Sequence, residues 1–266
     1  MAIDKIKMFR QASAFTSFHK KLGVLIEPYL DESWTVLDAG CGLGLLDLAI
    51  APSAAHITAV DIDRAAIADL KAHIDAELRA GRGPVGRIEP VCADVRGLQG
   101  EWDVVLMSFF GADLAEAERL IGMAKRRVIF IVHGLRPNGR FDPAPSETGG
   151  RRTVEELEIF LEEKGHRFRK SIVDLQFGQP FRTIEDIHAF LESYKMDPVE
   201  IPDMTGYLPN EGAVDIKNRE LSAAEDGFDI GRLVVSTEER IIKTDRYDYP
   251  YYLPRNMCVG IISVVK

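Results

Sequence analysis

The sequence is poor in cysteine and has no long apolar run. Its three cysteines, Cys41, Cys92 and Cys258, are scattered, and no two of them have a CxxC spacing. This argues against a disulfide scaffold, a zinc site and dithiol chemistry. No segment approaches the roughly 18 to 20 apolar residues that span a bilayer, and the first residues mix charged and apolar side chains, unlike a signal peptide. We therefore expect a cytoplasmic protein with no membrane partner.

Positive charge is also scarce. The chain has 33 Lys and Arg residues against 42 Asp and Glu residues, which gives a formal net charge of -9. This excess of negative charge opposes nonspecific attraction to nucleic-acid phosphates, so we expect no nucleic-acid partner. The length of 266 residues fits one core with an elaborated end better than three small domains.

Strand-like and helix-like patterns alternate from Trp34 onward. Short runs rich in β-branched residues are separated by segments of helical period, which is typical of a sheet with crossover helices. Strands are predicted at residues 34–38, 56–61, 87–92, 102–108, 127–133, 168–177 and 257–265, and helices at 45–50, 63–78, 154–164 and 183–194. The expected fold is α/β: a doubly wound, mostly parallel seven-stranded sheet with helices on both faces and a C-terminal insertion.

A glycine-rich turn, residues 38–44 with the sequence DAGCGLG, follows the first predicted strand. Glycine has no Cβ, so the backbone of such a turn can approach a polar ligand closely, and the start of a helix offers free N–H groups. A dinucleotide fingerprint requires a further glycine at position 45, where the sequence has Leu45. The turn therefore favours a nucleotide-like ligand other than NAD.

Residues 36–44 and three later motifs resemble the class I S-adenosylmethionine-dependent methyltransferases. Asp61 ends the second strand 17 residues after Gly44, Asp94 follows the third, and residues 103–111 resemble the fourth motif of that family. The resemblance spans roughly residues 34–135 and implies S-adenosyl-L-methionine as the cofactor.

The resemblance also implies roles for single residues. Asp38 and the glycine turn would hold the methionine part of the cofactor, Asp61 the ribose, and Asp94 the adenine. The implied cofactor-binding residues are Asp38, Gly40, Cys41, Gly42, Gly44, Asp61, Ile62, Asp94, Val95 and Met107. An acidic residue after a strand is also a common helix N-cap, so that alternative stays open for Asp61 and Asp94.

The fourth motif departs from relatives that methylate amino nitrogens. Those enzymes carry Asn or Asp, two prolines and an aromatic residue, whereas this chain has Ser108, Phe109 and Phe110. We expect these three residues to bind the acceptor, with the rings forming an apolar wall or contacting the sulfonium; ordinary core packing is the alternative. His133, at the end of the fifth strand, is a candidate general base, or a histidine bonded to the backbone.

We expect three regions: an N-terminal helical lid (1–33), a Rossmann-like core (34–177 and 257–266), and an insertion (178–256) that binds the acceptor. No group of residues has metal-ligand spacing, so no metal site is expected. The leading hypothesis is methyl transfer to a small-molecule acceptor through an O, S, N or C nucleophile. The alternatives are a noncatalytic S-adenosylmethionine-binding regulatory protein and an aminopropyl-type transferase. The oligomeric state stays open.

Overall fold

The computed structural model describes residues 4–111, 113–134, 153–194, 241–246 and 248–266. They belong to two compact units, each built from separate parts of the sequence. The larger comprises Ser17–Leu175 and Asn256–Lys266, and the smaller Met1–Thr16 and Gln176–Arg255. The stretch after Gly134 that is rich in Pro and Gly lies outside the described residues.

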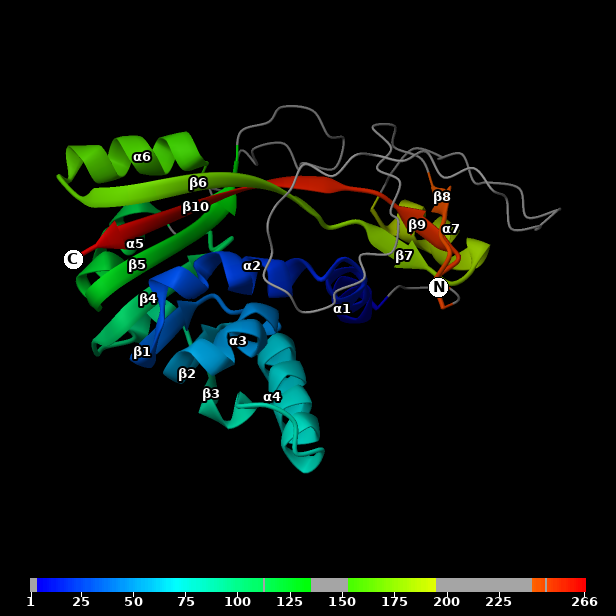
Figure 1. Ribbon diagram of the computed structural model, residues 1–266, viewed down its shortest axis with the longest axis horizontal. Coiled ribbons are helices and arrows are strands. Elements are labelled where there is room, and N and C mark those ends of the chain that lie inside the picture. Colours follow the sequence, from blue (N-terminus) through cyan, green and yellow to red (C-terminus); the bar gives the residue numbers. More distant parts are fainter. Residues whose placement is uncertain (1–3, 112, 135–152, 195–240, 247) are drawn as a thin grey trace. The chain divides into compact units, whose positions relative to one another are not determined.

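The larger unit contains a seven-stranded sheet in the order β3-β2-β1-β4-β5-β10-β6 (Figure 1). Strands β3, β2, β1, β4 and β5 are parallel to one another, and β10 is antiparallel to β5. The predicted α/β fold with a mostly parallel seven-stranded sheet is thereby confirmed. The strands are β1 (Asp31–Ala39), β2 (Ala54–Asp61), β3 (Ile88–Cys92), β4 (Trp102–Ser108), β5 (Ala124–His133), β6 (Arg167–Gln176) and β10 (Asn256–Val265).

Helices cover the sheet: α2 (Phe18–Ile26), α3 (Leu45–Ile50), α4 (Arg64–Arg79), α5 (Leu114–Gly122) and α6 (Val154–Glu163). The core on one face includes Leu37 and Ala39 of β1 together with residues of α5 and α6. Side chains alternate between the faces of a strand, so Asp38 projects to the other face. There α2 packs on α3, and α4 lies nearby (Figure 1).

The parallel register brings the carboxyl ends of five strands to one edge of the sheet. Ala39 pairs with Val60, and Asp61 with Cys92. On the other side of β1, the last residue of β4 pairs with Ile131 of β5. Ligands of open α/β sheets bind at this edge, and the residues singled out in the sequence lie along it.

The smaller unit has helices α1 (Lys5–Thr16) and α7 (Ile184–Ser193) and a sheet of three short antiparallel strands in the order β7-β9-β8. The strands are β7 (Gln179–Phe181), β8 (Ile242–Lys243) and β9 (Tyr251–Leu253). Tyr252 is fully buried, its ring stacks on Phe15 at 4.9 Å, and its hydroxyl accepts a hydrogen bond from the N–H of Gly178. The sequence analysis predicted α7 but not this sheet.

Candidate functional site

The glycine-rich turn between β1 and α3 is held by the end of β2. The N–H groups of Gly40 and Cys41 both donate to the carbonyl oxygen of Val60, at 2.8 and 3.0 Å. Gly42 has a φ of +53°, and no atom lies within 4 Å of the place where a Cβ would be. Glycine adopts such a left-handed backbone without strain. The turn is therefore open at Gly42.

Asp61 links this turn to the start of α4. One carboxylate oxygen accepts the N–H of Gly42 at 2.8 Å, and the other accepts the N–H of Asp63 at 2.8 Å. Asp63, rather than Asp61, caps α4 by accepting N–H groups of its first turn. A carboxylate can accept about four hydrogen bonds, so half-buried Asp61 retains capacity for a ligand. Ile62 beside it is 68% exposed.

Two carboxyl groups are buried beneath the turn. Asp38 of β1 and Asp47 of α3 are 1% and 0% exposed, and neither oxygen of Asp47 accepts a hydrogen bond from another group of the described residues. Burial, then the charges of Asp47 and Asp61, hold the pKa of Asp38 well above its ordinary value. Burial raises the pKa of Asp47 to about 7. Burial thus favours the protonated form of both groups, and a negative charge on Asp47 opposes the ionisation of Asp38.

The sequence analysis did not identify Asp47. It stands alone among apolar residues in the helix Leu-Leu-Asp-Leu-Ala-Ile, between the buried side chains of Leu46 and Ile50. An acidic side chain in so apolar a helix is the signal that could have identified it.

Cys41 of the glycine-rich turn lies close to the same carboxyl groups. Burial and the neighbouring carboxylates raise the pKa of its thiol. A thiol of this kind stays neutral and is a poor nucleophile.

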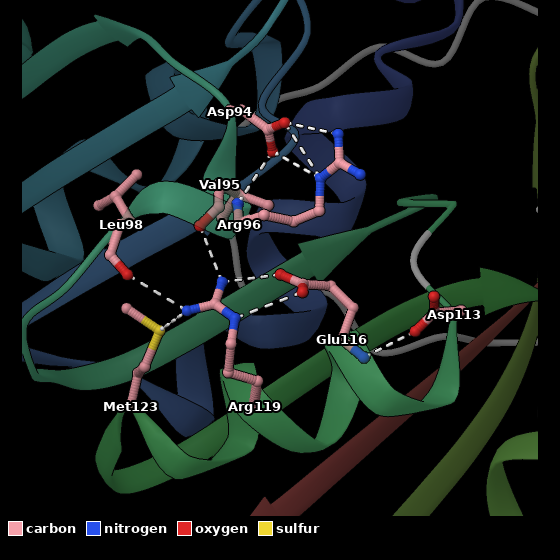
Figure 2. Close-up of polar contacts among 8 residues, drawn as sticks. All are labelled: Asp94, Val95, Arg96, Leu98, Asp113, Glu116, Arg119 and Met123. Carbon is pink, nitrogen blue, oxygen red and sulfur yellow. Dashed lines mark hydrogen bonds and ion pairs between the residues drawn. The ribbon is translucent and has the colours of Figure 1, made fainter.

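Asp94 begins the turn that follows β3 (Figure 2). It accepts the N–H of Arg96 at 2.9 Å and forms an ion pair with the guanidinium of Arg96 at 2.6 Å. Hydrogen bonds from Arg96 hold the pKa of Asp94 below its ordinary value. The side chains of Val95 and Met107 lie in the core of the larger unit, so they leave mainly their backbone for a ligand.

Phe109 follows β4 with a φ of 50°, which is rare for a bulky residue. Its N–H donates to the carbonyl oxygen of Ile131 at 2.7 Å. Its ring lies 4.9 Å from the ring of His133 and 6.3 Å from that of Phe18, measured between centroids. Such backbone conformations cost about 1–3 kcal/mol and cluster at functional sites. The geometry groups Phe109 and His133 with Phe18 of α2.

Phe110 lies against the glycine-rich turn. A Cβ on Gly40 would overlap the ring of Phe110, which explains why a glycine stands at position 40. Ser108, the last residue of β4, is half-buried. Of the residues predicted to bind an acceptor, Phe109 thus lies near Phe18 and His133, and Phe110 lies against Gly40.

The described part of the chain contains no group of three or more His, Cys, Asp or Glu side chains that could hold a metal ion. Within the same residues, no helix is long and apolar enough to cross a membrane.

Residues 36–128 match a family model described as a methyltransferase domain. The ribosomal protein L11 methyltransferase of Ruminiclostridium cellulolyticum is 24% identical over 139 residues, which cover 51% of this chain and 43% of that protein. The chloroplastic magnesium protoporphyrin IX methyltransferase of Arabidopsis thaliana is 29% identical over 126 residues, or 42% of this chain and 39% of that protein. The chain therefore spans less than half the length of these two relatives.

The crystal structure of the YcgJ protein from Bacillus subtilis is similar along nearly the whole chain. The similarity covers 93% of this chain and 98% of that one, with a TM-score of 0.51 and 13% sequence identity. At this identity the likeness concerns the fold alone.

Proposed function

Residues 36–128 are a class I S-adenosylmethionine-dependent methyltransferase domain, and we propose that this protein uses it to methylate a small-molecule acceptor. The observation that carries the proposal is the opening at Gly42 beside the carboxylate of Asp61. Close backbone approach and a charged acceptor for hydroxyl groups are what a nucleoside with a polar tail requires.

We assign the methionine part of the cofactor to the glycine-rich turn, above the pair Asp38 and Asp47. When either carboxyl ionises, its negative charge is buried, and no ion pair among the described residues neutralises it. A buried charge is costly unless it is paired, so the pair favours a cationic group close by. The methionine part of S-adenosylmethionine carries an ammonium and a sulfonium, which fit this requirement.

Asp61 is assigned to the ribose hydroxyls and Asp94 to the adenine amino group. S-adenosylmethionine supplies, when bound, a methyl group on a positively charged sulfur, which leaves readily. The chain therefore has to align the acceptor and exclude water, and it needs no catalytic triad. Phe109 and Ser108 would contact the acceptor, and His133 next to Phe109 would take up a proton if the acceptor must lose one.

The acceptor is proposed to be small because the chain is acidic overall and its fourth motif lacks the Asn or Asp and prolines of amino-nitrogen methyltransferases. The residues between β6 and β10 are proposed to determine which acceptor is used, since they lie outside the family match.

Titration calorimetry with S-adenosylhomocysteine tests the cofactor site. Asp61→Ala should weaken binding by about 2 to 3 kcal/mol, because it removes charge-assisted hydrogen bonds to the ribose. Asp63→Ala is the matched control: it removes a neighbouring carboxylate that caps α4 and should lower stability without changing affinity. Equal affinities of wild-type and Asp61→Ala would remove Asp61 from the site, and tighter binding of NAD would contradict the proposed function.

A further inference from the structure

Arg119 of α5 makes an unusually complete set of contacts with the turn that carries Asp94 (Figure 2). Its guanidinium donates to the carbonyl oxygens of Val95 at 2.7 Å and Leu98 at 3.2 Å. It also donates to both carboxylate oxygens of Glu116, at 2.7 and 3.3 Å. A guanidinium has five N–H donors in a rigid fork, and Arg119 uses them in several directions at once.

The 94–98 turn is thereby fixed from two sides. From within, the Asp94 carboxylate accepts the N–H of Arg96, and the N–H groups of Gly97 and Leu98 donate to the carbonyl oxygens of residues 94 and 95. From outside, Arg119 binds the carbonyls of residues 95 and 98. The ion pair of Asp94 with Arg96 is exposed and is expected to contribute little rigidity.

Arg119 itself is well supported. Its partner Glu116 is only 14% exposed, and the N–H of Glu116 donates to Asp113, which caps α5. The side chain of Met123 contacts the same guanidinium at 3.1 Å. A lysine cannot reproduce this arrangement, because an ammonium on a flexible stem lacks the planar fork.

We propose that Arg119 is a positioning residue that holds the 94–98 turn so that Asp94 selects the adenine amino group of the cofactor. The inference rests on the proposed function, since it takes Asp94 as the residue that meets adenine. In this proposal Arg119 acts through its hydrogen bonds to the turn and not by touching the ligand. Its removal should therefore change which base is preferred, an effect that a loss of stability alone does not produce.

The test compares two ligands by calorimetry: S-adenosylhomocysteine and S-inosylhomocysteine, in which a carbonyl replaces the amino group of adenine. Wild-type protein should prefer the adenine ligand by about tenfold or more, because a carboxylate accepts from an amino group and repels a carbonyl. Arg119→Met should reduce the preference to about threefold or less, and Arg119→Lys should give an intermediate value. Asp94→Asn should abolish it and serves as the reference.

Arg126→Met is the matched control. Arg126 also forms an ion pair, with Asp103 at 3.0 Å. Asp103 lies near the amino end of β4, whereas the candidate site lies at the carboxyl ends of the strands. This variant should keep the wild-type preference. Thermal unfolding checks that each variant is folded. If Arg119→Met does not fold, the ligand preference of Arg119→Lys is compared with that of wild-type protein instead.

The outcomes distinguish failure of the proposed function from failure of the role proposed for Arg119. If wild-type protein binds neither ligand, the proposed function fails. If it binds both and prefers adenine, but folded Arg119→Met or Arg119→Lys keeps the full preference, Arg119 has only a structural role and this inference alone is overturned.

Discussion

Two turns at the carboxyl edge of the sheet, the glycine-rich turn after β1 and the 94–98 turn after β3, both have carboxyl groups in or near them. The two turns differ in whether these carboxyl groups have cationic partners. Asp94 is paired with Arg96, and nearby Glu116 is paired with Arg119. Among the described residues, no ion pair involves Asp38, Asp47 or Asp61. Two of these are fully buried.

The difference indicates which part of a ligand each turn suits. At the 94–98 turn the carboxylates are already paired with arginines, so the turn can offer a neutral base such as adenine directed hydrogen bonds. At the glycine-rich turn, an unpaired buried negative charge is stabilised by a cation. We therefore expect the positively charged end of the cofactor at the glycine-rich turn and the adenine at the Asp94 turn.

The largest expected effect comes from closing the glycine-rich turn. Gly42→Val places a branched side chain in the open space of the turn and should lower affinity for S-adenosylhomocysteine by at least about a hundredfold. Gly81→Val is the matched control, since Gly81 also has a positive φ, +65°, and open space around its Cβ position. Both variants place a branched residue at a positive φ, so calorimetry should show the loss of affinity only at Gly42. Similar affinities for the two variants would contradict the assignment of the turn.

An intermediate effect is expected when the carboxyl pair is broken. The folded-state pKa of Asp47, about 7, lies above its ordinary value of 3.8, so the folded state binds a proton more tightly than the unfolded state. The contribution of Asp47 to stability should therefore be greatest below about pH 4 and should be lost as the pH rises toward 7.

Asp47→Asn removes this titration, because its amide is neutral and can donate to Asp38. At pH 8 the variant should be more stable than wild-type by an amount on the order of a few kcal/mol, given about 1.4 kcal/mol per pKa unit. At pH 4 the two should be similar. Urea unfolding at both pH values measures the difference in the free energy of unfolding. A difference that does not change with pH would show that ionisation of the pair does not destabilise the protein. The contrast drawn between the two turns would then be wrong.

The smallest effect on cofactor binding is expected from the smaller unit. A variant without residues 1–16, in which a short linker replaces residues 178–255, should keep affinity for S-adenosylhomocysteine within about tenfold, or 1.4 kcal/mol. It should no longer methylate an acceptor identified with the wild-type protein. Retained methylation would place acceptor recognition in the larger unit. A loss of cofactor affinity greater than tenfold would show that residues of the smaller unit also contribute to cofactor binding.

Most of the main sheet was predictable because most of its strands are apolar runs in the sequence. In β5, for example, residues 128–132 are all buried, as expected of a parallel strand covered on both faces. Asp61 and Asp94 were predicted as cofactor-binding residues because they end or closely follow the runs that form β2 and β3. The small sheet was not predicted: β7 and β9 have three residues each and pair across a long stretch of sequence.

Two residues of the site were missed for a different reason. Asp47 lies in a short helix, where an acidic side chain is normally expected to face water, but its side chain is fully buried. Arg119 has two backbone carbonyls among its partners, and no pattern of side chains reveals such contacts. Both roles arise only when segments distant in sequence are brought together.

The position of β10 also determines the order in which the larger unit can form. This strand lies between β5 and β6, and its residue Val259 pairs with His133. During synthesis the edge of β5 therefore lacks its partner until the residues between β6 and β10 have been made, and unpaired edges invite association with other chains. The larger unit must fold through a contact that is distant in sequence, which makes its completion slow relative to that of its first five strands.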